Sequence, residues 1–133
     1  MTSPEQLTGA VAVGIAELRE EFDTTDVVAT GDGGARVTVA RAPLPPSLTL
    51  SHTWVGFVIP YNYDEVQVYG HFVPADLLYV DGRTLMGPGL QAGQTWEERP
   101  AIKISRNSPR WHAGLDSAAS KLIQVLQWLG ERQ

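Results

Sequence analysis

Helical periodicity is confined to the two ends of this chain, and that placement constrains the fold more than any other feature. Near the start, apolar residues recur at three- and four-residue steps and form one stripe through Leu7, Val11, Ile15, Leu18 and Phe22. Near the end, a second stripe runs through Leu115, Ala119, Leu122, Leu126 and Leu129. The residues between the stripes follow strand and turn patterns, so we expect an α+β fold with helices at its ends.

The boundaries of the two helices are suggested by capping residues. Ser3 is a suitable N-cap for the first helix, with Pro4 at the first helical position. The last helix is expected to begin at Asp116, as its N-cap, and to end near Glu131. Its apolar arc is wide, which predicts either packing on two sides or an apolar contact surface, because the stripe is broadened by Ile123, Val125 and Trp128.

Four segments between the helices have the β-branched and alternating residues that are typical of strands: 26–30, 36–41, 50–59 and 66–73. The glycine-rich residues 31–34 favour a hairpin between the first two strands. The strands follow one another directly, so we expect a four-stranded antiparallel meander. Residues 84–94 are expected to form a long irregular loop, and residues 102–105 either a short strand or an extended segment.

Composition limits both the organisation and the function of the chain. A length of 133 residues predicts a single domain over residues 1–133. The absence of cysteine excludes disulfides, thiolate catalysis and cysteine-ligated metals. A net charge of −5 argues against non-specific nucleic-acid binding. The sequence has no long apolar run and no secretory leader pattern, so we expect a cytoplasmic protein that does not enter a membrane.

Positive charge is concentrated near the end of this acidic chain. Between residues 99 and 121, one acidic residue, Asp116, is outnumbered by five basic ones: Arg99, Lys103, Arg106, Arg110 and Lys121. Such a segment predicts either a docking surface for an acidic partner or a solvated basic face.

Several motifs beyond residue 36 form an ordered set. They are Leu44-Pro45-Pro46, Phe57-Val58-Ile59-Pro60-Tyr61-Asn62-Tyr63, Pro74-Ala75-Asp76, Asp81-Gly82, Trp96, Ser105-Arg106 and Trp111-His112-Ala113-Gly114-Leu115-Asp116. In this order they resemble the prokaryotic ubiquitin-conjugating-like proteins, in particular the group called prokaryotic family protein E. The resemblance implies the ubiquitin-conjugating fold, which has a first helix, a four-stranded meander, a long loop region with the active site, and terminal helices.

The chemistry of that family is missing from this chain. Ubiquitin-conjugating enzymes place a nucleophilic cysteine shortly before a tryptophan that precedes a helix, whereas the stretch before Trp111 offers Ile102-Lys103-Ile104-Ser105. The family's His-Pro-Asn motif is also absent. A thioester requires a thiolate, so we expect an inactive relative with no catalytic residue and no cofactor. The resemblance implies that it binds a ubiquitin-like modifier, or a ThiF-like activating enzyme, in a bacterial pathway.

The predicted binding surface combines the basic segment with the tryptophans around it. Basic side chains attract an acidic partner over a distance, and the broad apolar arc of the last helix supplies contact area. The residues expected to bind the protein partner are Trp96, Lys103, Arg106, Arg110, Trp111 and Trp128.

The alternative interpretation is a small metal- or ligand-binding protein, or an enzyme, that uses its histidines. These are His52, His71 and His112, and their long separations do not match a short metal-binding motif. A shared site would require them to converge in space, for example with His52 and His71 facing each other on adjacent strands. This alternative predicts a deep pocket lined by at least two histidines.

Overall fold

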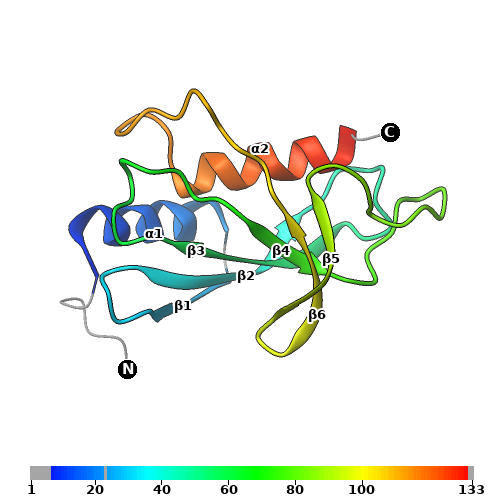
Figure 1. Ribbon diagram of the computed structural model, residues 1–133, viewed down its shortest axis with the longest axis horizontal. Helices are drawn as coiled ribbons and strands as arrows, with labels where there is room; N and C mark the ends of the chain where they lie inside the picture. Colours follow the sequence, from blue (N-terminus) through cyan, green and yellow to red (C-terminus); the bar gives the residue numbers. More distant parts are fainter. Residues whose placement is uncertain (1–6, 23, 132–133) are drawn as a thin grey trace.

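The computed structural model describes residues 7–22 and 24–131, and within these ranges the fold is α+β, with two helices and six strands. Figure 1 shows the elements in chain order: α1 (Gly9–Glu21), β1 (Thr25–Ala29), β2 (Ala35–Pro43), β3 (His52–Ile59), β4 (His71–Pro74), β5 (Leu90–Trp96), β6 (Arg99–Ile104) and α2 (Ala118–Glu131). The predicted α+β class, with helices toward the ends and strands between them, is confirmed.

The strands form one antiparallel sheet in the order β1-β2-β3-β4-β6-β5. The strands β1 to β4 are neighbours in chain order, and the hairpin predicted at residues 31–34 joins β1 to β2. The predicted number of strands is wrong, because the described sheet has six strands rather than four. The two additional strands form the β5–β6 hairpin, and β6 pairs with β4, for example Lys103 opposite Phe72.

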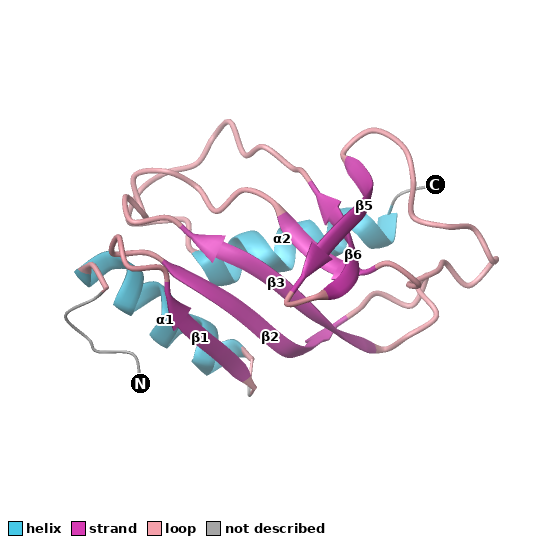
Figure 2. Cartoon of the chain, turned by 60° about the horizontal axis from the view of Figure 1, so that its bottom comes forward, coloured by secondary structure: helices cyan, strands magenta, loops and turns pink. Residues whose placement is uncertain are grey.

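The helices α1 and α2 cover one face of the sheet, which lies in front of them in Figure 2. The side chains of the first apolar stripe that follow Leu7, namely Val11, Ile15, Leu18 and Phe22, are buried. Burial of each such side chain contributes about 1.5–3 kcal/mol, so the apolar stripe holds the helix on the sheet. In the described part of the chain, no helix is long and apolar enough to cross a membrane.

The opposite face of the sheet is partly covered by Trp96, which comes from the end of β5. Its side chain is 3% exposed, and its ring stacks on Phe72 with 5.1 Å between centroids. The indole nitrogen donates a hydrogen bond of 2.9 Å to Oγ1 of Thr38. A glycine is required beneath the ring, because a Cβ atom at Gly56 would lie 2.1 Å from it. The central strand β3 is thus covered on both sides.

The first helix begins later than its capping residues predicted. Ser3 and Pro4 lie outside the described residues, and α1 begins at Gly9 with Thr8 as its N-cap. Leu7 precedes this helix and forms a bridge with Gly33, so it does not belong to the helical stripe.

The prediction that Asp116 caps α2 is wrong. Ser117 and Ser120 cap the helix reciprocally, since each hydroxyl accepts a hydrogen bond from the other's backbone nitrogen. The Asp116 carboxylate instead accepts a 2.7 Å hydrogen bond from the backbone nitrogen of His112. Leu115 was predicted to lie in the inner stripe but is 83% exposed, because the helix begins after it.

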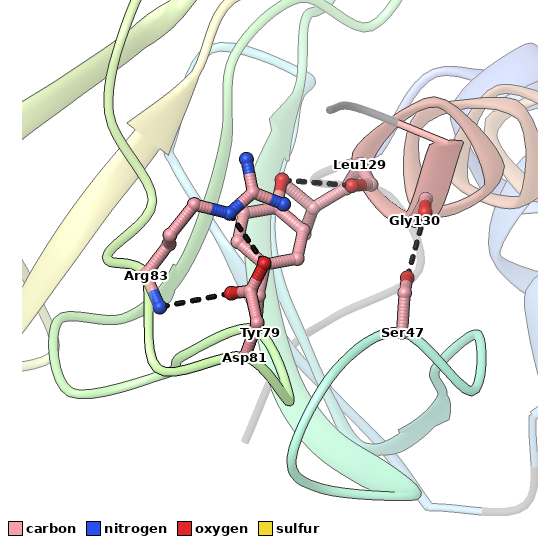
Figure 3. Close-up of polar contacts among 6 residues, drawn as sticks. All are labelled: Ser47, Tyr79, Asp81, Arg83, Leu129 and Gly130. Atoms are coloured by element: carbon pink, nitrogen blue, oxygen red, sulfur yellow. Dashed lines mark hydrogen bonds and ion pairs between the residues drawn. The ribbon is translucent and has the colours of Figure 1, made fainter.

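The C-terminal end of α2 is held by two hydroxyl groups from distant loops (Figure 3). Tyr79 donates a 2.9 Å hydrogen bond to the carbonyl of Leu129, and Ser47 donates one of 2.6 Å to the carbonyl of Gly130. These bonds satisfy carbonyl groups that have no partner within the helix. Pro45 packs so closely that a Cβ atom at Gly130 would lie 2.3 Å from it. The last turn of α2 is therefore fixed to the rest of the domain.

Most strand boundaries differ from the sequence prediction by one or two residues, and the largest differences lie at the starts of β4 and β5. Residues 66–70 were predicted as strand, but β4 starts only at His71. The reason is that the Gln67 side chain holds the segment after β6, and Gly70 has a φ of 91° that interrupts a strand. The predicted loop over residues 84–94 contains the beginning of β5, which starts at Leu90. The extended segment at 102–105 is part of strand β6 up to Ile104.

Candidate protein-binding surface

Arg106 and Trp128, two of the predicted binding residues, are in contact. The guanidinium carbon of Arg106 lies 4.6 Å from the centre of the Trp128 ring, an arrangement in which a cation is attracted to the aromatic face. Arg106 follows β6 and is exposed, and Trp128 is half-buried on α2. Ile123, also on α2, is 39% exposed, but it lies five residues before Trp128 and therefore on a different side of the helix. We define the Arg106 face as Arg106 and Trp128.

Trp111 serves mainly to anchor the loop before α2. Its indole nitrogen donates a 2.7 Å hydrogen bond to the carbonyl of Asp64, and its ring centroid lies 6.3 Å from that of Tyr63. The carboxylate of Asp64 in turn accepts a 2.8 Å hydrogen bond from the backbone nitrogen of Gly114. Arg110 lies exposed in the same loop. These contacts give the loop a defined position between β6 and α2.

The remaining two predicted binding residues, Lys103 and Trp96, lie on the face of the sheet that is not covered by the helices. Lys103 of β6 is half-buried and pairs with Phe72 of β4, close to Gly70. Trp96 is buried against the same face. Its ring lies under the guanidinium of Arg36, which forms a 3.1 Å ion pair with Glu97. The six predicted residues therefore do not form one continuous surface.

Lys121 was counted in the exposed basic segment, but the structure buries it. The residue is 1% exposed, and its Nζ atom donates three hydrogen bonds. The acceptors are Oε1 of Gln67 at 2.7 Å, the carbonyl of Arg106 at 2.6 Å and Oγ of Ser108 at 2.5 Å. All three are uncharged. The ammonium thus connects α2 to two segments that lie far from it in sequence.

The surroundings of Lys121 disfavour its charged form. Burial is the main cause, and the nearby charge of Arg106 adds to it, so that the pKa of Lys121 falls from 10.5 to about 8. Asp116 acts in the opposite direction and to a smaller extent. The side chain still carries its charge at neutral pH.

A pocket of about 70 Å³ opens beside this ammonium. It lies between the segment after β6 and one side of α2, and its walls are formed by Arg106, Asn107, Ser108, Lys121, Gln124, Val125 and Trp128. The sequence did not predict this pocket, since a lysine on an apolar helix face gives no sign of which residues surround its amine.

The three histidines are not brought together. His52 and His112 are exposed, whereas His71 is fully buried and packs on Phe57 with 5.1 Å between ring centroids. The suggestion that His52 and His71 face each other is wrong, because His71 lies opposite Phe57 and His52 opposite Pro43. Within the described residues, no group of three or more His, Asp and Glu side chains is placed to hold a metal ion.

His71 is a neutral histidine in the core. Neither of its ring nitrogens has a hydrogen-bond partner among the described residues. Burial lowers its pKa from 6.5 to about 3, with a further contribution from the charge of Lys121.

Two larger hollows lie away from the Arg106 face, and the sequence predicted neither. One, of about 400 Å³, has acidic and apolar walls between α1 and the loop before α2; its lining includes Val13, Glu17, Asp64, Leu115 and Asp116. The other, of about 320 Å³, is lined by Trp54, Pro74, Ala75, Asp76, Arg99 and Pro100. Neither contains a histidine, so neither is the pocket that the alternative interpretation predicts.

Comparisons of this chain with protein-family models, with curated proteins and with solved structures found no match.

Proposed function

We propose that this chain is a non-catalytic protein-binding module of the ubiquitin-conjugating-like class, and that it recognises a ubiquitin-like modifier or the ThiF-like enzyme that activates one. The observation that most directly supports protein binding is the Arg106–Trp128 pair. In this pair an exposed cation lies over an aromatic ring on the last helix. Arginine and tryptophan are among the residue types that most often dominate the binding energy of protein interfaces.

The composition supports a non-catalytic role within that class. The chain has no cysteine, and neither an amine nor a hydroxyl can replace a thiolate in thioester exchange. Lys103, which occupies part of the stretch where the family places its nucleophile, is half-buried on a strand. The backbone nitrogen of Ser105 donates a 2.8 Å hydrogen bond to the carbonyl of Gly89. These residues contribute to the sheet and its edge.

The arrangement of elements supports the class assignment in part. A helix at the start, four strands paired in chain order and a helix at the end are the features that the resemblance implies. The β5–β6 hairpin between β4 and α2 occupies the region where the family has its long active-site loop. A hairpin there is compatible with a scaffold that has kept its surfaces while lacking the reaction.

The Arg106 face suits an acidic partner with an apolar centre. Arg106 supplies positive charge at the surface, Trp128 supplies apolar area, and Arg110 is a further exposed cation in the loop that follows. Charge complementarity of this kind raises the association rate, while the aromatic contact slows dissociation.

The test is direct binding, measured by calorimetry, to ubiquitin-like proteins and ThiF-like enzymes encoded near this chain. We expect binding to at least one of them, and we expect Arg106→Glu with Arg110→Glu to weaken it about 100-fold. Arg19→Glu is the matched control, because Arg19 is an exposed arginine on α1. Failure to bind any of these candidates would exclude the proposed partner class.

A further inference from the structure

The hydrogen bonds of Lys121 do not account for the presence of a charged side chain at this buried position. Its three hydrogen bonds to Gln67, Arg106 and Ser108 satisfy the ammonium, but every acceptor is neutral. Within the described residues, no acidic side chain forms an ion pair with Lys121 or Arg106. Burying an ammonium without an ion-paired acidic side chain is costly, and the charge of Asp116 offsets only part of that cost.

The pocket beside Lys121 is of a size and composition that suit a small anion. Its volume of about 70 Å³ is several times the space that one water molecule requires, which is about 10–15 Å³. It is far smaller than the roughly 300–1,000 Å³ of pockets that hold drug-sized ligands. Its walls combine two cationic side chains, Lys121 and Arg106, with polar side chains from Asn107, Ser108 and Gln124.

The pocket is accessible from solvent at its rim. Arg106, Asn107 and Gln124 are exposed, while Lys121 lies at the buried end. Arg106 is held over the Trp128 ring, so its guanidinium already lies at the wall of the pocket before any ligand arrives. Such preorganisation lowers the cost of binding.

We propose that this pocket is an oxyanion site, which takes a single carboxylate, phosphate or sulfate group between Lys121 and Arg106. The guanidinium donates hydrogen bonds to the oxygens of the group, because its planar fork matches such oxygens. The buried ammonium supplies the compensating charge from the inner end. This site does not depend on the proposed function, although an acidic residue of a protein partner is one source of the group.

The test is an NMR titration of the whole chain with inorganic phosphate, sulfate and N-acetylglutamate amide, each at constant ionic strength against chloride. We expect saturable shifts of the Trp128 indole and Ser108 backbone signals with at least one of these anions. Phosphate or sulfate binding identifies a free anion, whereas binding of the glutamate analogue alone identifies an acidic side chain as the source. Shifts equal to those with chloride would overturn the proposal.

Two variants and a control distinguish anion binding in this pocket from nonspecific attraction of anions to basic residues. Arg106→Gln removes one cation and retains the buried network, because Lys121 contacts the Arg106 carbonyl and not its side chain. Lys121→Met removes the other cation. We expect each variant to weaken anion binding at least about tenfold. Arg19→Gln removes an exposed arginine of α1 that does not line the pocket, and the anion affinity of this variant should equal that of the unaltered protein.

A further readout distinguishes an anion site from a structural lysine. An anion beside the ammonium favours its charged form, so saturating anion should raise the pKa of Lys121 above about 8. This pKa is measured from the Lys121 side-chain NMR signals with and without the anion. If anions bind but neither Arg106→Gln nor Lys121→Met weakens binding, the pocket is not the site and the proposal fails.

Discussion

The Nζ atom of Lys121 lies 2.7 Å from the side-chain oxygen of Gln67, so a residue of the last helix is joined to the segment that precedes β4. The same oxygen of Gln67 accepts a 2.7 Å hydrogen bond from the backbone nitrogen of Ser108. One amide side chain therefore positions both the helix and the segment that carries Arg106. The Arg106 face depends on this contact for its geometry.

Replacing Gln67 should destabilise the protein. Gln67→Met removes an acceptor from a buried ammonium and from a backbone nitrogen, and we expect the free energy of unfolding to fall by about 2–3 kcal/mol. Urea unfolding measures this change. Gln127→Met, at an exposed position of α2, should alter the stability by less than about 0.5 kcal/mol. Equal effects of the two variants would show that the Gln67 contacts do not stabilise the fold.

The buried His71 should make stability depend on pH. Its pKa is about 3 in the folded protein and 6.5 in an ordinary setting, so between these values the unfolded chain binds a proton that the folded protein does not. The free energy of unfolding should therefore fall as the pH falls below 6.5, by about 1 kcal/mol per pH unit from this residue.

The variant His71→Leu isolates this contribution. Urea unfolding of the wild type and the variant at pH 7 and pH 5 gives the pH dependence of each, and the acidic residues contribute to both. We expect the wild type to lose more stability than the variant over this range, by about 2 kcal/mol. A variant with the same pH dependence as the wild type would contradict a neutral, buried His71.

The contact between Gly56 and Trp96 should tolerate no side chain. Gly56→Ala places a Cβ atom 2.1 Å from the Trp96 ring, so the ring must move and its stacking on Phe72 is lost. We expect a loss of about 1–3 kcal/mol, together with a change in tryptophan fluorescence. Gly9→Ala is the control, because a Cβ atom there would have no neighbour within 4 Å and the helix gains an alanine. An unchanged stability for Gly56→Ala would contradict the placement of Trp96.

The turn between β5 and β6 should become more stable when a glycine is introduced. Glu97 and Glu98 have φ angles of 50° and 66°, a conformation that costs a residue with a side chain about 1 kcal/mol. Glu98→Gly removes that cost while the ion pair of Glu97 with Arg36 remains. We expect a gain of about 0.5–1 kcal/mol in the free energy of unfolding, against no gain for Glu98→Ala. A loss with Glu98→Gly would contradict the turn geometry.

The same turn explains why the sequence did not predict the outer hairpin. Two-residue hairpin loops with positive φ angles are usually marked by Asn-Gly or Asp-Gly, and Glu97-Glu98 carries no such mark. The helix stripes and the glycine-rich β1–β2 hairpin were predictable because apolar spacing and glycines act locally. The shortening of β4 was not, since it depends on contacts between Gln67 and residues about forty positions later.

The candidate site was predictable only in part for a similar reason. Composition and spacing indicated that Arg106 and Trp128 belong to a basic, apolar region, and the structure brings them into contact. The burial of Trp96 and Lys121 was not predictable, because it follows from tertiary packing against Gly56 and Gln67. Charge counted along the sequence therefore overestimated the exposed positive charge by at least the buried Lys121.

The proposed binding of the Arg106 face to a component of a ubiquitin-like pathway is tested most directly by calorimetric titration. This chain is titrated with the ubiquitin-like proteins and ThiF-like enzymes encoded beside it, in parallel with Arg106→Glu and Arg19→Glu. We expect one of these partners to bind the wild type and Arg19→Glu with equal affinity, and Arg106→Glu at least about tenfold more weakly. Equal affinity of the partner for the wild type, Arg19→Glu and Arg106→Glu would contradict the proposed role of this face. So would the absence of binding to the wild type.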